Sequence, residues 1–237
     1  MTWRHVLVAV LAAALFSGPA AGKETRAQGI DVSHFQHEID WQAVAASGRF
    51  SFAIVKATEG VDSLDERFQA NWRGAQRAGL IRGAYHFFEP KDDAMEQVDF
   101  FLKTTGDAFE PGTLPPILDV EIGRGVDPKA IVEGVAAWLE AVEKATGRTP
   151  ILYTGWRFWN SLGTQAFGRY PLWLAEYGTA EADLTLPAGW SEWTLWQRSE
   201  RGRVSGIEKA VDLNLFAGTE QDLQQFALGS AAERPPR

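Results

Sequence analysis

The apolar positions of this chain form short runs that alternate with longer amphipathic stretches every few tens of residues. Runs rich in β-branched and aliphatic residues predict strands at 28–32, 50–57, 82–87, 117–121 and 151–154. Helical spacing of apolar residues predicts helices at 41–45, 68–78, 92–102 and 128–146. Asp127 is the expected N-cap of the helix at 128–146, with Pro128 at its first position, and Gly147 is expected to end it. The repeated strand–helix order predicts a parallel sheet with helices outside it.

The pattern becomes less regular beyond Gly155. Strands are predicted at 172–175, 193–197 and 210–215, but the segments between them are rich in Gly and Pro rather than clearly helical. We therefore expect an α/β fold, an irregular TIM-like β/α barrel with its later helices reduced, and not an open doubly wound sheet. No Gly/Ser/Pro linker interrupts the chain, so residues 23–228 are expected to form a single domain, followed by a frayed tail at 229–237.

The first 22 residues have a different composition from the rest. One positive charge precedes an apolar run over 6–16, and a segment of small residues follows at 17–22. This arrangement is typical of a secretory signal peptide, and the apolar run is too short to cross a bilayer. We expect cleavage between Ala20 and Lys23 and export to the periplasm or the medium, without stable membrane insertion of the mature chain. The alternative is an uncleaved N-terminal anchor.

Composition restricts the chemistry of the remaining chain. The sequence contains no cysteine, which excludes disulfides, thiolate metal sites and a thiol nucleophile. Its four histidines lack the spacing of metal ligands, and no phosphate-binding or serine-nucleophile motif is present, so we expect no metal and no cofactor. The formal net charge of −8 argues against a nucleic-acid partner. We expect a monomer.

Two acids, Asp119 and Glu121, follow the apolar run at 115–118 and are separated only by Val120. Side chains two apart on a strand point to the same face, with Cα atoms about 6–7 Å apart. Crowded carboxyls repel each other when both are ionised, which raises the pKa of one of them. A protonated acid beside an ionised one is suited to breaking a glycosidic bond. The pair alone is a weak signal, because surface strands carry such pairs by chance.

Two further acids strengthen this interpretation. In a parallel barrel, functional side chains gather at the C-terminal ends of the strands. Asp31 lies at the end of the first predicted strand and Asp212 within the last, and a barrel closes its first strand against its last. We therefore expect both acids to face the same cleft as Asp119 and Glu121. For each of them individually, a turn cap or a solvated strand end is an equally good explanation.

Aromatic residues supply the candidate walls of such a cleft. Sugar rings stack on aromatic planes, so an acidic floor with tryptophan walls suits a polysaccharide. Of the ten tryptophans, several fall at predicted strand ends or in loops, namely Trp156, Trp159, Trp173, Trp193 and Trp196, whereas Trp41, Trp72 and Trp138 lie on helical faces and are expected to pack. His86 follows Tyr85 at the end of the third main strand, and it is either a substrate partner or a core histidine.

The ordered motifs of the chain are specific to one family. They are Gly29-Ile30-Asp31-Val32-Ser33, Ile39-Asp40-Trp41, Lys56-Ala57-Thr58-Glu59-Gly60, Gly83-Ala84-Tyr85-His86-Phe87, Leu118-Asp119-Val120-Glu121, Tyr153-Thr154, Pro171-Leu172-Trp173, Trp196-Gln197 and Val211-Asp212-Leu213-Asn214. The chain resembles family 25 of the glycoside hydrolases, the lysozymes that cleave peptidoglycan, from about residue 29 to residue 228. One departure is Gln36-His37-Glu38, where the family commonly has Gln-Gly, and it places a bulky histidine near the expected groove rim.

The resemblance implies an N-acetylmuramidase that cleaves the β-1,4 bond between N-acetylmuramic acid and N-acetylglucosamine. By position, Glu121 matches the general acid, Asp119 its partner, and Asp31 and Asp212 the flanking acids. We expect substrate contacts from Lys56, Tyr85, His86, Tyr153, Trp156, Trp173, Trp196 and Gln197. Two alternatives remain, namely a catalytically silent peptidoglycan-binding module on the same barrel, and a glycosidase for another N-acetylated polysaccharide. Spacing does not tell whether Asp119 is a nucleophile or orients the substrate's acetamido group.

Overall fold

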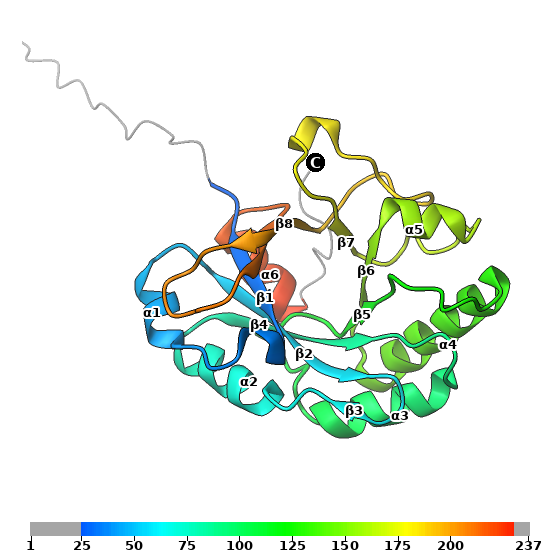
Figure 1. Cartoon of the computed structure of the whole chain (residues 1–237), viewed down its shortest axis with the longest axis horizontal. Coiled ribbons are helices and arrows are strands. Elements are labelled where there is room, and N and C mark those ends of the chain that lie inside the picture. The colour runs from blue at the N-terminus through cyan, green and yellow to red at the C-terminus, as the bar shows by residue number, and fades with distance from the viewer. Residues whose placement is uncertain (1–24, 230–237) are drawn as a thin grey trace, which may run out of the picture.

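The computed structural model describes residues 25–229, so the expected leader at 1–22 and the tail beyond Gly229 lie outside the described residues. Its centre is a closed β-barrel (Figure 1). The strands are β1 (Gln28–Val32), β2 (Phe52–Glu59), β3 (Ser63–Leu64), β4 (Ile81–Phe87), β5 (Ile117–Asp119), β6 (Ile151–Gly155), β7 (Leu172–Ala175), β8 (Leu195–Gly202) and β9 (Val211–Phe216). The pairing order is β1-β9-β8-β7-β6-β5-β4-β2, and β1 also pairs with β2. The short β3 only extends β2 as an antiparallel hairpin.

Helices follow most of the strands. They are α1 (Trp41–Ala46), α2 (Phe68–Arg77), α3 (Ala94–Thr105), α4 (Pro128–Thr146), α5 (Trp156–Ser161) and α6 (Glu220–Leu228), with 3-10 turns η1 (His34–Gln36) and η2 (Glu181–Asp183). Asp127 caps α4 by accepting a hydrogen bond from the Lys129 N–H, and Gly147 ends it in a left-handed conformation. The later helices are reduced, as expected, although two short ones, α5 and α6, form where none was predicted.

The expectation of a fully parallel sheet is wrong at one strand. β9 runs antiparallel to both β8 and β1, whereas the other barrel pairs are parallel. The connection from β8 to β9 contains only the eight residues 203–210, too few for the crossover that parallel neighbours need. The reversal matters for the site, because Asp212, at the start of β9, pairs with Asp31, near the end of β1.

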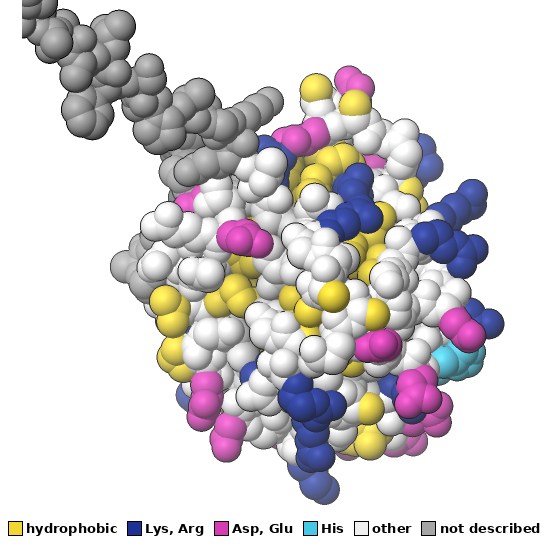
Figure 2. Space-filling model, turned by 90° about the vertical axis from the view of Figure 1, so that its left-hand side faces the viewer, with side chains coloured by type: hydrophobic (Ala, Val, Ile, Leu, Met, Phe, Trp, Pro, Cys, Tyr) yellow, Lys and Arg dark blue, Asp and Glu magenta, His cyan; other side chains and the backbone are white. Residues whose placement is uncertain are grey.

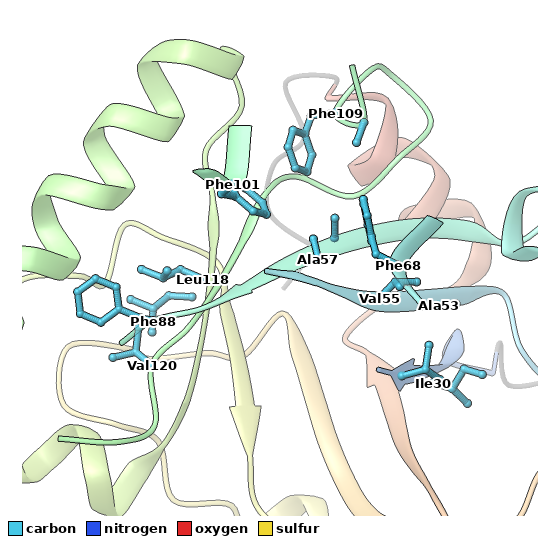
Figure 3. Close-up of a cluster of buried hydrophobic side chains, with 14 of the residues drawn as sticks. Ile30, Ala53, Val55, Ala57, Phe68, Phe88, Phe101, Phe109, Leu118 and Val120 are labelled. Atoms are coloured by element: carbon cyan, nitrogen blue, oxygen red, sulfur yellow. The ribbon is translucent and has the colours of Figure 1, made fainter. Parts of the chain in front are cut away.

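Two apolar layers follow from the alternation of side chains along the strands. On β2, Phe52 and Ile54 point into the barrel and pack with apolar residues of β5, β6 and β8, while Leu223 and Phe226 of α6 belong to the same cluster. The intervening β2 residues, Ala53, Val55 and Ala57, face the outer layer beneath the helices (Figure 3). Figure 3 shows part of that layer, in which aromatic side chains such as Phe68, Phe88 and Phe101 cover the outside of the barrel.

The inward-facing rows change from apolar to polar along β2, β5, β6 and β8. Phe52 and Ile54 are followed by Lys56, Ile117 by Asp119, Ile151 by Tyr153, and Leu195 by Gln197. On β1 the inward positions are Gly29 and Asp31, and a Cβ at Gly29 would lie 2.3 Å from the Phe52 ring. The lower barrel is therefore a packed core, and the polar ends of the rows form one site at the C-terminal side of the strands.

Candidate active site

A pocket of about 350 Å³ opens at this end of the barrel. It is lined by Asp31, Val32, Ser33, Phe35, Gln36, Lys56, Tyr85, Phe87, Asp119, Glu121, Tyr153, Trp173, Tyr177, Gln197, Glu200 and Asp212. All four acids predicted from the sequence thus share one cavity. The pocket is a groove with a polar floor, which is typical of a site for a hydrophilic substrate.

Asp119 and Glu121 differ in exposure although they are two residues apart. Asp119 ends β5 and its side chain is buried, while Val120 packs into the core and Glu121, just after the strand, is exposed. Burial, and then the nearby Glu121 charge, raise the pKa of Asp119 well above its ordinary value. Partial desolvation of its carboxyl in the pocket also raises the pKa of Glu121, whereas the nearby Tyr153 hydroxyl lowers it. The pair therefore retains a proton more readily than two free carboxyls.

One oxygen of Asp119 has an unusual environment. Its Oδ1 is buried and has no hydrogen-bond partner among the described residues. A buried carboxylate oxygen without a partner is costly, and natural proteins place such atoms mainly where a ligand or water completes them. This oxygen is therefore available to a donor group on a molecule in the pocket.

Asp31 and Asp212 form a second carboxyl pair. Asp31 is 5% exposed and accepts hydrogen bonds from Asn214 Nδ2 at 2.7 Å and from Gln197 Nε2 at 3.0 and 3.1 Å. Asp31 and Asp212 are also hydrogen-bonded to each other. Burial, and then the charge of Asp31, raise the pKa of Asp212 to about 8. The proton of the pair therefore resides on Asp212 and the negative charge on Asp31, which has the additional donors.

Lys56 is the basic side chain of the pocket lining. It is 8% exposed, and its Nζ lies 2.5 Å from Glu59 Oε2 and 5.0 Å from the centre of the Phe87 ring. Its positive charge lowers the pKa values of Asp119 and Glu121 and opposes the effect of burial on both. Lys56 thus limits the accumulation of negative charge on the pocket floor.

Most of the predicted contact residues lie in the pocket, but three do not. Lys56, Tyr85, Tyr153, Trp173 and Gln197 line it. His86 does not, because it is fully buried between Thr58 Oγ1 (2.7 Å from Nδ1) and Gln97 Oε1 (2.9 Å from Nε2) and stacks on Trp138. Its burial also lowers its pKa to about 4. His86 is therefore a core histidine, the other of the two roles considered for it.

The tryptophan wall is smaller than the sequence suggested. Trp196 is 5% exposed, lies outside the pocket and donates its indole N–H to the Glu176 carbonyl. Trp156, at the start of α5, also lies outside the pocket, and Trp159 is fully buried against Phe167 and Trp190. Trp173 reaches the pocket but is only 2% exposed. Helical-face packing is confirmed for Trp41 and Trp138, which are buried.

The aromatic residues that the pocket does expose were missed from the sequence. Phe35 is 67% exposed and Tyr177 is 44% exposed, and both line the cavity. Phe35 lies in η1, a turn held by a Ser33–Gln36 capping box and by Gln36 Nε2, which donates to the Ala210 carbonyl. Phe35 and Tyr177 lie in or near short irregular segments, where periodicity carries little information.

His37 follows this turn but is not among the residues that line the pocket. Its backbone has φ 57° and ψ −133°, a conformation that favours glycine. A glycine, the residue that the resemblance implies here, would adopt this conformation without strain. Histidine at position 37 therefore strains the backbone, and its side chain does not line the pocket.

Among residues 25–229, no group of three or more His, Asp or Glu side chains has a geometry that could hold a metal ion. No helix of this part is long and apolar enough to cross a membrane. On the face in Figure 2, acidic and basic side chains are interspersed and form no continuous basic surface. The pocket lining presents carboxyls, phenols, amides and the ammonium group of Lys56.

Comparisons with known proteins agree with this geometry. The family model "Glycosyl hydrolases family 25" matches residues 30–207. Lysozyme M1 of Streptomyces globisporus is 36% identical over 86% of this chain and 72% of its own length, and the uncharacterized protein YegX of Escherichia coli K12 is 42% identical over 85% and 73%. The crystal structure of the lysozyme from Streptomyces coelicolor superposes with a TM-score of 0.81, at 35% identity over 87% of this chain and 99% of that one. The chain belongs to family 25 of the glycosyl hydrolases.

Proposed function

We propose that this protein is an exported lysozyme, an N-acetylmuramidase that hydrolyses the β-1,4 bond between N-acetylmuramic acid and N-acetylglucosamine in peptidoglycan strands. Family membership and the names of the relatives support the enzyme class. The observation that carries the site assignment is the unpartnered, buried Oδ1 of Asp119 in the same pocket as Glu121. This arrangement is suited to catalysis, because Glu121 can donate a proton while the buried Asp119 beside it accepts a donor group of the substrate.

In this mechanism Glu121 is the general acid. Its exposure lets it reach the glycosidic oxygen, and its raised pKa keeps a proton available. Glu121 donates that proton as the bond to the leaving sugar breaks, and positive charge develops at the anomeric carbon. While Glu121 holds the proton, it no longer raises the pKa of Asp119, and the carboxylates of Asp119 and Asp31 stabilise this charge. A water molecule then completes hydrolysis, and its proton returns to Glu121.

Asp119 has two possible roles in this scheme. It either attacks the anomeric carbon or orients the substrate's 2-acetamido group, which then attacks it. The free Oδ1 supports the second role, because an acetamido N–H is a donor that would complete its hydrogen bonding. The preference for an N-acetylated sugar follows from the same contact.

The test is Glu121→Gln, which keeps size and polarity but removes the transferable proton. We expect kcat to fall by at least ~10²-fold, the usual scale of general acid catalysis. Glu133→Gln on the surface of α4 is the matched control, because it makes the same chemical change at an exposed residue outside the pocket. Near-normal hydrolysis by the Glu121 variant, with an unchanged circular dichroism spectrum, would exclude Glu121 from the role.

The products distinguish the alternatives. Digestion of purified peptidoglycan, followed by mass analysis of the new reducing ends, should give muramic acid ends. Glucosamine ends would indicate the other bond of the glycan strand. Binding to peptidoglycan without release of any reducing ends would favour a catalytically silent module.

A further inference from the structure

The turn η1, which carries Phe35 at the groove rim, is held at both ends by the loop between β3 and α2. At its first residue, the His34 N–H donates to Asp65 Oδ2 at 2.9 Å. After its last residue, the His37 carbonyl accepts a hydrogen bond from Arg67 Nε at 3.1 Å. The two contacts come from residues about thirty positions further along the chain, so only the folded barrel brings them to the turn. The backbone on either side of Phe35 therefore has a defined position.

Asp65 fixes the side chain of His34 as well as its backbone. The Asp65 side chain is fully buried, and its Oδ2 lies 2.8 Å from His34 Nδ1. Its other oxygen, Oδ1, accepts the Arg67 N–H at 2.9 Å, and its own N–H donates to the Ala57 carbonyl at 3.0 Å. An ionised aspartate can only accept hydrogen bonds, so the imidazole Nδ1 carries the hydrogen between them. The imidazole ring is thus held at one edge by a carboxyl that is itself immobile.

The imidazole of His34 is in contact with the ring of Phe35. The two ring centres lie 4.1 Å apart, with an angle of 37° between the ring planes. Successive side chains of a 3-10 turn point about 120° apart, so such a contact does not follow from the turn itself. Phe35 lines the pocket and is 67% exposed, whereas His34 is not among the lining residues. His34 therefore supports the phenyl ring from outside the pocket.

We propose that His34, held by Asp65, is a positioning residue that keeps the Phe35 ring in place for stacking on a sugar of the substrate. An exposed side chain that becomes ordered only on binding loses rotamer freedom, and this loss weakens affinity. A ring that is already supported loses less. The inference rests on the proposed function, because it requires that a glycan strand occupies the groove and contacts Phe35.

The expected effect is on binding and not on the chemical step. Neither His34 nor Asp65 lines the pocket that holds the four acids. A change at His34 should therefore raise KM and leave kcat unchanged. A residue that served only the stability of the fold would not produce this separation, since loss of folded protein lowers the apparent kcat instead.

The perturbation is His34→Asn. The asparagine Nδ2 takes the place of the imidazole Nδ1, so the bond to Asp65 is kept while the ring against Phe35 is lost. We expect KM for soluble peptidoglycan fragments to rise ~2–5-fold, with kcat and the melting temperature close to those of wild type. His37→Asn is the matched control, because it makes the same chemical change in the residue after the turn, whose side chain does not line the pocket. Its KM should equal that of wild type.

A double-mutant cycle with Phe35→Ala tests whether His34 acts through the phenyl ring. In the Phe35→Ala background, His34→Asn should give no further rise in KM. A rise of the same size in both backgrounds, a fall in kcat at unchanged KM, or a Phe35→Ala variant with the wild-type KM would each overturn the inference. If Glu121→Gln retains activity, the proposed function fails, whereas an inactive Glu121→Gln combined with an unchanged KM for His34→Asn refutes only the role of His34.

Discussion

Replacing Asp212 by asparagine should stabilise the protein while it alters the site. Asp212 faces Asp31 across the β1–β9 pair, and its pKa is raised to about 8, first by burial and then by the Asp31 charge. Wild type must keep a proton on this carboxyl to avoid two adjacent charges. The amide of an asparagine donates to Asp31 at every pH and carries no charge. The variant therefore removes a pH-dependent cost of folding.

The sign and size of the effect follow from linkage. A carboxyl whose pKa is higher in the folded state than in the unfolded state contributes stability below its unfolded pKa of about 3.8, and that stability is lost as the pH rises to about 8. At about 1.4 kcal/mol per pH unit, full burial would make the loss at pH 7 about 4 kcal/mol. Asp212 is only partly buried, so solvent screening reduces this value to about 1–3 kcal/mol.

Thermal unfolding of both proteins between pH 4 and pH 8 measures this effect. The melting temperature of Asp212→Asn should exceed that of wild type by about 2–10 °C at pH 7–8, and the difference should shrink towards pH 4. Asp31→Asn is the contrasting variant, because Asp31 carries the charge of the pair and accepts from Gln197 and Asn214. It should lower kcat and move the alkaline limb of the activity profile down. A melting-temperature difference between Asp212→Asn and wild type that does not change with pH would refute the assignment of the proton to Asp212.

Two further predictions concern the turn at the groove rim. Phe35→Ala should raise KM for peptidoglycan fragments about 2–10-fold, as expected for loss of one aromatic stacking contact. Leu64 is an exposed apolar residue outside the pocket, so Leu64→Ala should leave KM unchanged. Equal KM values for the two variants would remove Phe35 from substrate binding. His37→Gly should raise the melting temperature by a few degrees, because relief of about 1–3 kcal/mol of backbone strain exceeds the entropic cost of glycine. An unchanged or lower melting temperature would contradict the strain at His37.

Local patterns predicted most of the elements of the barrel. The alternation of apolar runs with amphipathic stretches located the main strands, and the Asp127-Pro128 start and Gly147 stop defined α4 almost to the residue. These features are visible because they depend on neighbouring residues, through hydrogen bonds and backbone preferences within a few positions. The short helices α5 and α6 were missed, since few residues leave little periodicity to detect.

The four acids could also be proposed from the sequence, because their motifs are ordered along the chain and fall at or near strand ends. The sequence could not predict which of these acids holds a proton. Asp31 and Asp212 are separated by most of the chain, and only the antiparallel β9 places them in register. The burial of His86 and Trp196 could not be predicted either, because it depends on packing by distant elements. A residue type indicates the chemistry that is possible at a position, whereas its solvent exposure is decided by the whole fold.

The sequence by itself therefore determined the barrel class and the family and proposed the four acids, since each rests on local periodicity or on motif order. Only the tertiary structure decided which acid holds a proton, which aromatic residues reach the groove and how Gln197 joins Asp31 to Tyr153. Desolvation and hydrogen-bond direction arise when strands from opposite ends of the chain close around the pocket. Asp31 meets Gln197 and Asn214 only at that closure, so no stretch of sequence could have revealed the network.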